Sequence, residues 1–258
     1  MSGFDQARII RTYDDRLSNT IHQRFFEHSG LSNLGYWGPD IATGRQAAVR
    51  LVDELLGAPT ATVGAILDVA CGAGGSTERL LDRYPAGGIT AINISGRQLA
   101  EAERRAPGCR FVVMDACALD FPDETFDTVL CVEAAFHFNT RARFLAEAYR
   151  VLKPGGRLAL SDILFRRGVP VSDVPPANRT TLEGYREMLQ GMGFRDIEMR
   201  DATAETWDVF ERRYVPFARA CLRPLSFAAR VRGGASLRAW QYLTHASISR
   251  YLLIGAAK

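Results

Sequence analysis

The first sixty residues place apolar positions at helical spacing, with one interruption. Apolar and charged residues are mixed in this way over Phe4–Glu27 and again over Gly44–Leu56. The segment between them, Ser29–Asp40, is rich in Gly, Ser, Asn and Pro, which is typical of a loop. We therefore predict an N-terminal helical cap over residues 1–60.

After Gly57–Thr60 the rhythm changes, and short apolar segments begin to alternate with helical ones. The segments with strand character are Ala65–Ala70, Gly88–Ser95, Cys109–Asp115, Thr128–Ala134, Arg157–Leu164, Phe194–Arg200 and Ser249–Ala257. Strands separated by helices predict βαβ crossovers, and apolar strand interiors indicate a parallel sheet with helices on both faces. Residues 61–258 are thus expected to form one α/β domain.

Residues 204–247 depart from this alternation and are largely helical, with expected breaks at Pro216, Pro224 and Gly233–Gly234. The segment is rich in aromatic and other large apolar residues, namely Trp207, Phe210, Tyr214, Phe217, Leu222, Phe227, Trp240 and Tyr242. We predict a helical insert between the sixth and seventh strands. Packing within the insert, or a face between two copies of the chain, explains most of these side chains.

Composition narrows the class of protein without identifying it. The 258 residues are 47% hydrophobic and 24% charged with a formal net charge of +3, which is typical of a globular protein. A charge so close to balance gives no reason to expect a nucleic acid or an anionic membrane as a partner. The five scattered cysteines include no CxxC pair, which favours reduced thiols over disulfides or zinc. With charges near its start and no apolar run of about 18 residues, the chain is expected to be cytoplasmic, as a monomer or homodimer.

The strongest local motif is DVACGAGGST, at Asp68–Thr77. A strand candidate runs into glycines and then into a helix that Ser76 or Thr77 can cap. Gly72 and Gly74 allow a sharp turn and let a ligand approach the main chain, and the helix N-terminus favours an anion. The spacing fits both the AxGxxG of dinucleotide-binding folds and DxAxGxG, and a tight turn without a ligand needs similar glycines.

A longer set of motifs distinguishes between these ligands: ILDVACGAGG, AINISGRQLAEA, MDACALDFPDETFDTVLCVEAAFHF and AYRVLKPGGRLALSD. In this order they resemble the class I S-adenosylmethionine-dependent methyltransferases over most of the chain. The upstream NLGYW is similar to the small-molecule branch, which includes natural-product and tocopherol methyltransferases. The resemblance implies a Rossmann-like, seven-stranded sheet whose last strand is antiparallel, with S-adenosylmethionine at the carboxyl ends of the first strands.

The resemblance also implies residues that hold the methionine end of the cofactor. Asp68 would hold the ammonium group, directly or through water, and Gly72 and Gly74 would admit the methionyl and ribose portions. Ala70 stands where the family usually has its first glycine, so the turn is expected to be tighter.

The ribose and adenine would be held by the segments after the second and third strands. Asn93 replaces the acid that the family usually places there, so we expect a weaker grip on the ribose, supplemented by Gln98 next to Ile94. Asn93 also counts against a nicotinamide cofactor, whose sites generally use an acid. Asp115, beside Ala116, would accept from the adenine amine, although capping of the next segment also explains this aspartate.

Methyl transfer to a hydroxyl needs alignment of the two reactants and a base for the hydroxyl proton. Of the four histidines, His137 directly follows the fourth strand, at the ligand-binding edge of such sheets. In related sugar methyltransferases a histidine near this point is the base, supported by an acid after the fifth strand, which here would be Asp162. The alternative is that His137 has no catalytic role and simply packs between Phe136 and Phe138. Glu133 is expected in the cofactor pocket or as a cap rather than as a second base.

Aromatic residues of the cap are candidates for closing over the cofactor. Tyr13, Tyr36 and Trp37 lie in or beside expected loops, and an aromatic face near a sulfonium is favourable. Ordinary packing of a helical lid explains them as well. In the small-molecule branch, an insert such as 204–247 walls the acceptor site together with the N-terminal helices, and an aromatic wall would suit a lipophilic acceptor.

These observations predict a methyltransferase that moves a methyl group from S-adenosylmethionine to a hydroxyl of a small, hydrophobic specialised metabolite. No metal is expected, since the His, Cys, Asp and Glu residues lack ligand spacing. The alternatives are N- or C-methylation, and cyclisation or rearrangement without methyl transfer. A third alternative is an oxidoreductase that binds a nicotinamide cofactor.

Overall fold

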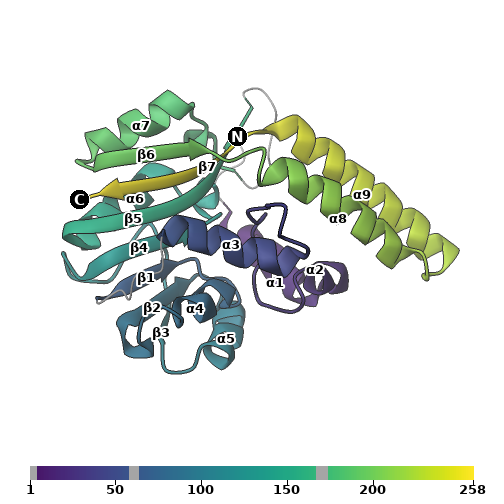
Figure 1. Ribbon diagram of the computed structural model, residues 1–258, viewed down its shortest axis with the longest axis horizontal. Coiled ribbons are helices and arrows are strands. Elements are labelled where there is room, and N and C mark those ends of the chain that lie inside the picture. Colours follow the sequence, from purple (N-terminus) through teal and green to yellow (C-terminus); the bar gives the residue numbers. More distant parts are fainter. Residues whose placement is uncertain (1–4, 58–63, 167–173) are drawn as a thin grey trace.

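A seven-stranded β-sheet forms the centre of the computed structural model (Figure 1), which describes residues 5–57, 64–166 and 174–258. The strands are β1 (Ile66–Val69), β2 (Ile89–Asn93), β3 (Arg110–Val113), β4 (Phe126–Val132), β5 (Leu152–Phe165), β6 (Arg195–Asp201) and β7 (Ile248–Ala257). They lie in the order β3-β2-β1-β4-β5-β7-β6. The first five pair in parallel, whereas β7 is antiparallel to both β5 and β6. The expected Rossmann-like sheet with a reversed last strand is confirmed.

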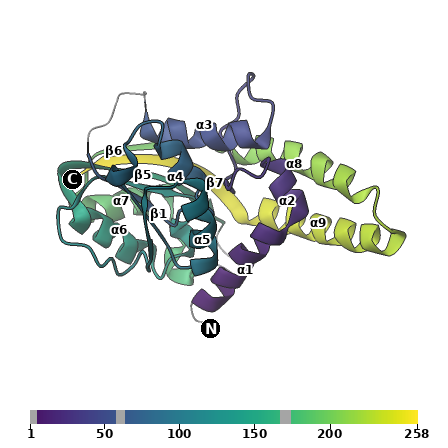
Figure 2. The same ribbon diagram turned by 90° about the horizontal axis from the view of Figure 1, so that it is seen from below.

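Helices cover both faces of this sheet (Figure 2). They are α1 (Gln6–Ser18), α2 (Thr20–Phe25), α3 (Gly44–Leu56), α4 (Gly75–Leu80), α5 (Gly96–Arg105), α6 (Arg141–Val151), α7 (Leu182–Gly191), α8 (Trp207–Leu222) and α9 (Phe227–Ser247). The described residues also form short 3-10 turns: η1 (Ala86–Gly88), η2 (Ala135–His137) and η3 (Pro176–Asn178). Helices α3 and α4 pack on one face and α6 and α7 on the other, so the central strands are buried on both sides.

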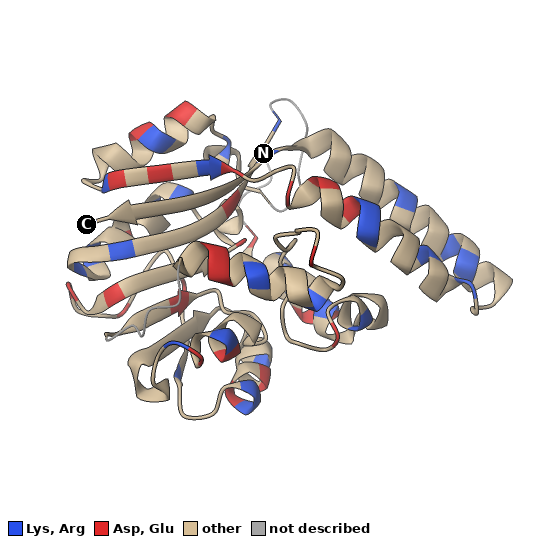
Figure 3. Cartoon of the chain, in the orientation of Figure 1, with Lys and Arg blue, Asp and Glu red and all other residues tan. Residues whose placement is uncertain are grey.

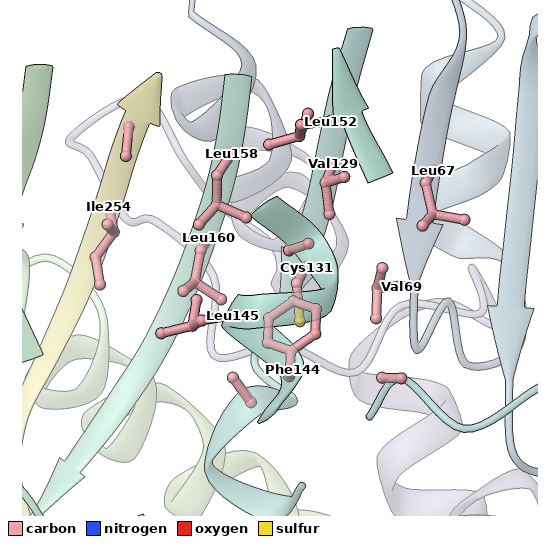
Figure 4. Close-up of a cluster of buried hydrophobic side chains, with 14 of the residues drawn as sticks. Leu67, Val69, Val129, Cys131, Phe144, Leu145, Leu152, Leu158, Leu160 and Ile254 are labelled. Atoms are coloured by element: carbon pink, nitrogen blue, oxygen red, sulfur yellow. The ribbon is translucent and has the colours of Figure 1, made fainter. Parts of the chain in front are cut away.

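Neighbouring positions of a central strand belong to different cores. On β1, Ile66 packs in the cluster that includes α3, whereas Leu67 and Val69 pack in the cluster that includes α6 and α7. In Figure 4, Leu67 and Val69 lie on the same side of the sheet as Phe144 of α6. An unbroken apolar strand is what two covered faces require.

Two local expectations are corrected, and a third is not tested. The helix expected over Phe4–Glu27 is divided at Asn19, whose side chain accepts a hydrogen bond from the His22 amide and so begins α2. The fifth strand, expected to begin at Arg157, already begins at Leu152, so the KPGG segment is part of β5. The boundary expected between residues 60 and 61 lies outside the described residues.

The region 204–247 folds as a long helical hairpin of α8 and α9. Only Pro224 of the expected breaks lies between the helices, because α8 continues through Pro216 and α9 through Gly233–Gly234. One proline costs one backbone hydrogen bond, and aromatic packing such as Tyr214 against Trp240 (ring centroids 5.6 Å apart) stabilises the pair.

Candidate functional site

A cavity lies at the carboxyl ends of β1, β2, β3 and β4, where ligands of open α/β sheets bind. The loops after these strands form its floor, through residues 70–73, 93–95, 114–116 and 132–134. Helix α1 covers it, contributing Ile9, Tyr13 and Leu17 among others. The N-terminal helices are therefore part of the site.

The glycine turn after β1 has the open main chain that the sequence predicts. Gly72 has φ +58°, and a Cβ built on it would have only the Gln98 Oε1 within 4 Å, at 3.8 Å. Gly74 has φ +86°, and a Cβ there would lie 2.6 Å from the Ala102 Cα of α5. Gly72 therefore leaves room for a ligand, whereas Gly74 is needed for close helix packing. Ala70 also has a positive φ, +58°, which costs strain for a residue with a side chain.

Asp68 lies beneath this turn rather than in the cavity wall. The side chain is 1% exposed, and its Oδ2 accepts hydrogen bonds from Ser76 Oγ (2.8 Å) and Thr77 Oγ1 (2.7 Å). Burial raises the pKa of Asp68 to about 6. The carboxylate holds the first turn of α4, and Ser76 lies between it and the cavity lining. The expected hold on the cofactor ammonium group, directly or through water, stays a prediction.

Polar residues at the ends of β2 and β3 do line the cavity, as expected. Asn93 Nδ2 donates to Gln98 Oε1 (2.7 Å), and both side chains are buried, with Ile94 beside them in the lining. Asp115 and Ala116 also line the cavity. Asp115 Oδ1 accepts from the Cys117 amide (2.8 Å) in an Asx turn, and within the described residues 64–166 no helix follows before β4 for it to cap, so the capping alternative is wrong.

His137 ends η2 and faces the cavity opposite α1. The hydroxyl of Tyr13 lies 2.7 Å from the His137 Nε2, and the two rings meet edge to face. This contact joins the N-terminal cap to the loop after β4. Of the three cap aromatics, Tyr13 is the one that reaches the cavity.

Asp162 does not support His137, which corrects the expectation from the sequence. Its Oδ2 accepts from the Arg141 Nε (2.6 Å) and the Tyr185 hydroxyl (2.9 Å), and its Oδ1 from the Ile163 amide (2.8 Å). Asp162, Arg141 and Tyr185 are all fully buried. Buried guanidinium and carboxylate groups must be paired, and the arginine at the start of α6 takes this aspartate as its counterion.

A buried asparagine that the sequence analysis missed holds the segment around His137. Asn178 Nδ2 donates to the carbonyls of Phe136 (3.0 Å) and Phe138 (2.7 Å), on either side of the histidine. Asn178 Oδ1 accepts from the Arg141 amide (2.6 Å). Asn178 therefore links the start of α6 to the segment that carries His137. A single asparagine in the loop before α7 carries no motif that could have announced this role.

Glu133 follows β4 in a left-handed conformation, with φ +51°, and lines the cavity. Its Oε1 accepts from the Leu34 amide (2.5 Å) and the Tyr251 hydroxyl (2.6 Å), which links the cap and β7 to the site. Burial raises the pKa of Glu133 to about 7. The expected pocket position is present, with the carboxylate already engaged by two donors.

Tyr36 and Trp37 lie away from the cavity, contrary to the expectation that they close over a cofactor. Trp37 is buried in the core that α2 and α8 share, with its Nε1 donating to the Leu34 carbonyl (2.9 Å). Tyr36 lies beneath the guanidinium of Arg200, on β6. A large aromatic side chain gains more hydrophobic stabilisation when it is buried in this core than when it lies at the rim of the cavity. The α8–α9 hairpin likewise contributes no residue to the cavity lining.

The comparisons with known proteins agree with this geometry. Residues 67–160 match the family described as a methyltransferase domain. The erythromycin 3''-O-methyltransferase of Saccharopolyspora erythraea is 31% identical over 202 residues, which cover 68% of this chain and 66% of that protein. The chain belongs to the class I S-adenosylmethionine-dependent methyltransferases.

Two further similarities span different portions of this methyltransferase. The 27-O-demethylrifamycin SV methyltransferase of Amycolatopsis mediterranei is 37% identical over 137 residues, half of each chain. The crystal structure of the [4+2]-cyclase SpnF is 27% identical with a TM-score of 0.75, covering 97% of this chain and 95% of that one. The chain spans about half to two thirds of the length of these curated relatives.

S-adenosylmethionine is the cofactor of this family, and the cavity fits it. The cofactor has cationic ammonium and sulfonium groups, ribose hydroxyls and an adenine amine. The cavity offers the open main chain at Gly72 and the carbonyl or carboxylate oxygens of Asn93, Asp115 and Glu133, set among apolar side chains. Hydrogen-bond acceptors placed at separate points of an apolar wall suit a ligand with several separated polar groups.

Among the described residues, no three His, Cys, Asp or Glu side chains come together in a way that could hold a metal ion. None of their helices combines the length and the apolar character needed to cross a membrane.

Proposed function

We propose that this methyltransferase transfers the methyl group of S-adenosylmethionine to a hydroxyl of a small, hydrophobic specialised metabolite. The acceptor would lose its hydroxyl proton and gain the methyl group, and S-adenosylhomocysteine would leave. The single observation that carries the proposal is the Tyr13–His137 contact over the cavity: it presents an imidazole nitrogen to a hydroxyl group. A carbon acceptor would need a different kind of stabilisation.

The cofactor would occupy the floor of the cavity. We assign its amino-acid end to the turn at Gly72 with Ser76, its ribose to the Asn93–Gln98 pair next to Ile94, and its adenine to Asp115 and Ala116; Ala70 and Gly74 shape the turn. S-adenosylmethionine supplies an activated methyl group when bound, so the chain has chiefly to align the acceptor. Because Asn93 is neutral, its hydrogen bonds to ribose hydroxyls would be weaker than those of a carboxylate.

His137 would be the general base. A neutral imidazole whose Nε2 accepts from a hydroxyl carries its proton on Nδ1, and this tautomer can take a proton at Nε2. The Tyr13 hydroxyl marks the direction from which the acceptor hydroxyl would approach. Base catalysis of this kind contributes roughly 10² to 10⁴ in rate.

The cavity lining supports a hydrophobic acceptor. Helix α1 contributes Ile9, Ile10 and Leu17, the end of β4 contributes Val132, and the segment after η2 contributes Phe138. Such surfaces contribute to binding in proportion to the apolar area they bury. Two of the similar proteins are named as the erythromycin 3''-O-methyltransferase and the 27-O-demethylrifamycin SV methyltransferase. Both names agree with a hydroxyl group of a small molecule as the acceptor.

A second function is favoured by one specific similarity. The SpnF structure, at 27% identity, is named as a [4+2]-cyclase. The same cavity could therefore shape a substrate for cyclisation, with the cofactor bound but unreacted. In that case Glu133 and His137 would orient the substrate without moving a methyl group.

Product analysis separates these functions. The purified chain is incubated with S-adenosylmethionine carrying a ¹³C methyl group and an extract of the organism that encodes it. O-methylation predicts a product heavier by one labelled methylene unit, equimolar S-adenosylhomocysteine, and a ¹³C shift typical of a methoxy group. His137→Asn should lower this turnover at least a hundredfold. A methyl shift typical of nitrogen or carbon, or a rearranged product of unchanged mass, would reject the proposal.

A further inference from the structure

The α8–α9 hairpin extends away from the sheet and ends in free space (Figures 1 and 2). Its start is anchored: Trp207 and Phe210 are buried against the core that contains Phe25 and Trp37. Beyond that, α9 has one buried residue, Ser247, at its very end. The distal part of the hairpin, residues 219–243, therefore has few contacts to the body, and most of its large side chains other than Leu222 and Trp240 face solvent.

Bulky apolar side chains are exposed on this distal hairpin. Phe227 is 74% exposed, Val231 50% and Tyr242 75%, with Leu225 and Leu243 also exposed. Phe227, Val231 and Tyr242 share one stripe of α9, since their spacings of four and eleven residues return to the same face. Leu225 and Phe227 are at the turn between the helices, so the extremity of the projection is apolar. Bulky apolar side chains that gather in this way at an exposed tip mark an interaction site.

Charge on the hairpin is of one sign. Residues 212–258 contain nine of the 32 Lys and Arg and no Asp or Glu, whereas residues 1–211 hold 23 basic residues against 29 acidic ones. Figure 3 shows blue bands without red along the hairpin beyond the start of α8. The exposed arginines of the distal part are Arg219, Arg223, Arg230, Arg232 and Arg238. None of these five forms an ion pair with a carboxylate of the described residues.

We propose that the distal hairpin docks on the surface of an anionic lipid membrane. Leu225, Phe227 and Val231 would enter the boundary between headgroups and acyl chains, while Arg223, Arg230 and their neighbours would contact the lipid phosphates. Exposed bulky apolar residues with Lys or Arg beside them are typical of surfaces that bind at this boundary. In this chain they gather at the turn of the hairpin rather than along one whole face of α9. Clusters of four to eight such cations, roughly, are typical of binding to anionic lipids.

The shape of the hairpin favours a lipid surface over an acidic protein. The apolar residues are at the end of a convex projection, and a bilayer accommodates such a tip without a preformed groove. A protein partner would need a matching concave surface, and the aromatic residues would be expected at the centre of a flat patch. The overall charge balance gives no hint of this surface, because the acids of residues 1–211 mask the basic hairpin. Docking does not depend on the proposed O-methylation, although it would bring the chain to lipophilic acceptors.

Vesicle flotation with the full chain tests the proposal. We expect the chain to float with vesicles of phosphatidylcholine containing roughly one-third phosphatidylglycerol, to bind pure phosphatidylcholine weakly, and to dissociate as salt is raised. Each arginine replaced by glutamine should weaken binding about fivefold, so the variant with Arg223, Arg230 and Arg232 all changed should bind roughly a hundredfold more weakly. The Leu225→Ser, Phe227→Ser double variant should lose the part of vesicle binding that persists at high salt, because that part comes from the apolar side chains.

Matched controls lie on the body of the molecule. Val113→Ser removes an apolar side chain that is 62% exposed on β3, and the triple variant Arg45→Gln, Arg104→Gln, Arg195→Gln removes as many exposed charges. Both should bind vesicles like the wild type. The proposal is overturned if the wild type ignores anionic vesicles, or if the controls lose as much binding as the hairpin variants. Self-association of the free chain that only the hairpin variants abolish, without vesicle binding, would show that the surface serves a second copy instead.

Discussion

The hydroxyl of Tyr13 lies 2.7 Å from the His137 Nε2, and this contact connects two segments separated by 124 residues. Tyr13 belongs to α1, which covers the cavity, and His137 to the turn after β4, which forms part of its wall. The position of the cap over the cavity and the orientation of the proposed base are therefore coupled through this contact.

Tyr13→Phe keeps the ring and removes this hydrogen bond. One hydrogen bond contributes about 0.5–1.5 kcal/mol, so we expect S-adenosylhomocysteine to dissociate roughly two to ten times faster as α1 opens more often. Hydrogen exchange of the amides of residues 6–18 should quicken by a similar factor. Unchanged exchange in α1 would show that the contact does not hold the cap.

Asn178→Ala removes the amide that holds the main chain on both sides of His137. We expect kcat to fall at least tenfold while the affinity for S-adenosylhomocysteine stays within about twofold, since the asparagine touches the base segment and not the cavity floor. Glu183→Gln, an exposed change in α7, is the control. Equal losses in kcat and in cofactor affinity would indicate a general disruption rather than a positioning role.

Asp162→Asn separates the sequence expectation from the structure. The structure gives Arg141 a buried partner in Asp162, so the variant leaves an uncompensated guanidinium and should lose about 3–5 kcal/mol of unfolding free energy. The free energy is measured by urea unfolding without cofactor. If the aspartate instead served His137, stability would change little while turnover fell, and the assignment to Arg141 would be wrong.

Glu133→Gln should change how stability depends on pH. The pKa of Glu133 is raised in the fold to about 7, above its ordinary 4.5, so its stabilising contribution is complete below about pH 4.5 and is lost as the pH rises through 7. Wild-type stability should therefore fall by up to roughly 3 kcal/mol between pH 4.5 and 8 relative to the variant. Asp68 titrates in the same direction in both proteins, so the difference isolates Glu133. Parallel pH curves for the two proteins would contradict the raised pKa.

The fold and the cavity floor could be predicted from the sequence because topology alone determines them. The carboxyl ends of parallel strands lie at the same edge of a sheet. Residues at or just after those ends therefore line one cavity, here Gly72, Asn93, Asp115 and His137. No comparable rule governs the partner of a buried side chain.

The partners of Asp162 could not be predicted for that reason. Arg141 begins a helix and Asn178 lies in a loop, and their distance from the aspartate is set by packing that no spacing encodes. The same holds for Trp37, whose burial depends on α8, about 170 residues later. The hairpin itself was expected to wall the acceptor site, whereas its residues lie outside the cavity lining.

Calorimetric titration of the full chain tests the central claim most directly. The cavity at the ends of β1 to β4 should bind S-adenosylhomocysteine at one site per chain, with an affinity that Asn93→Ala weakens, and NADH should give no heat. Heat with NADH and none with S-adenosylhomocysteine would contradict the account.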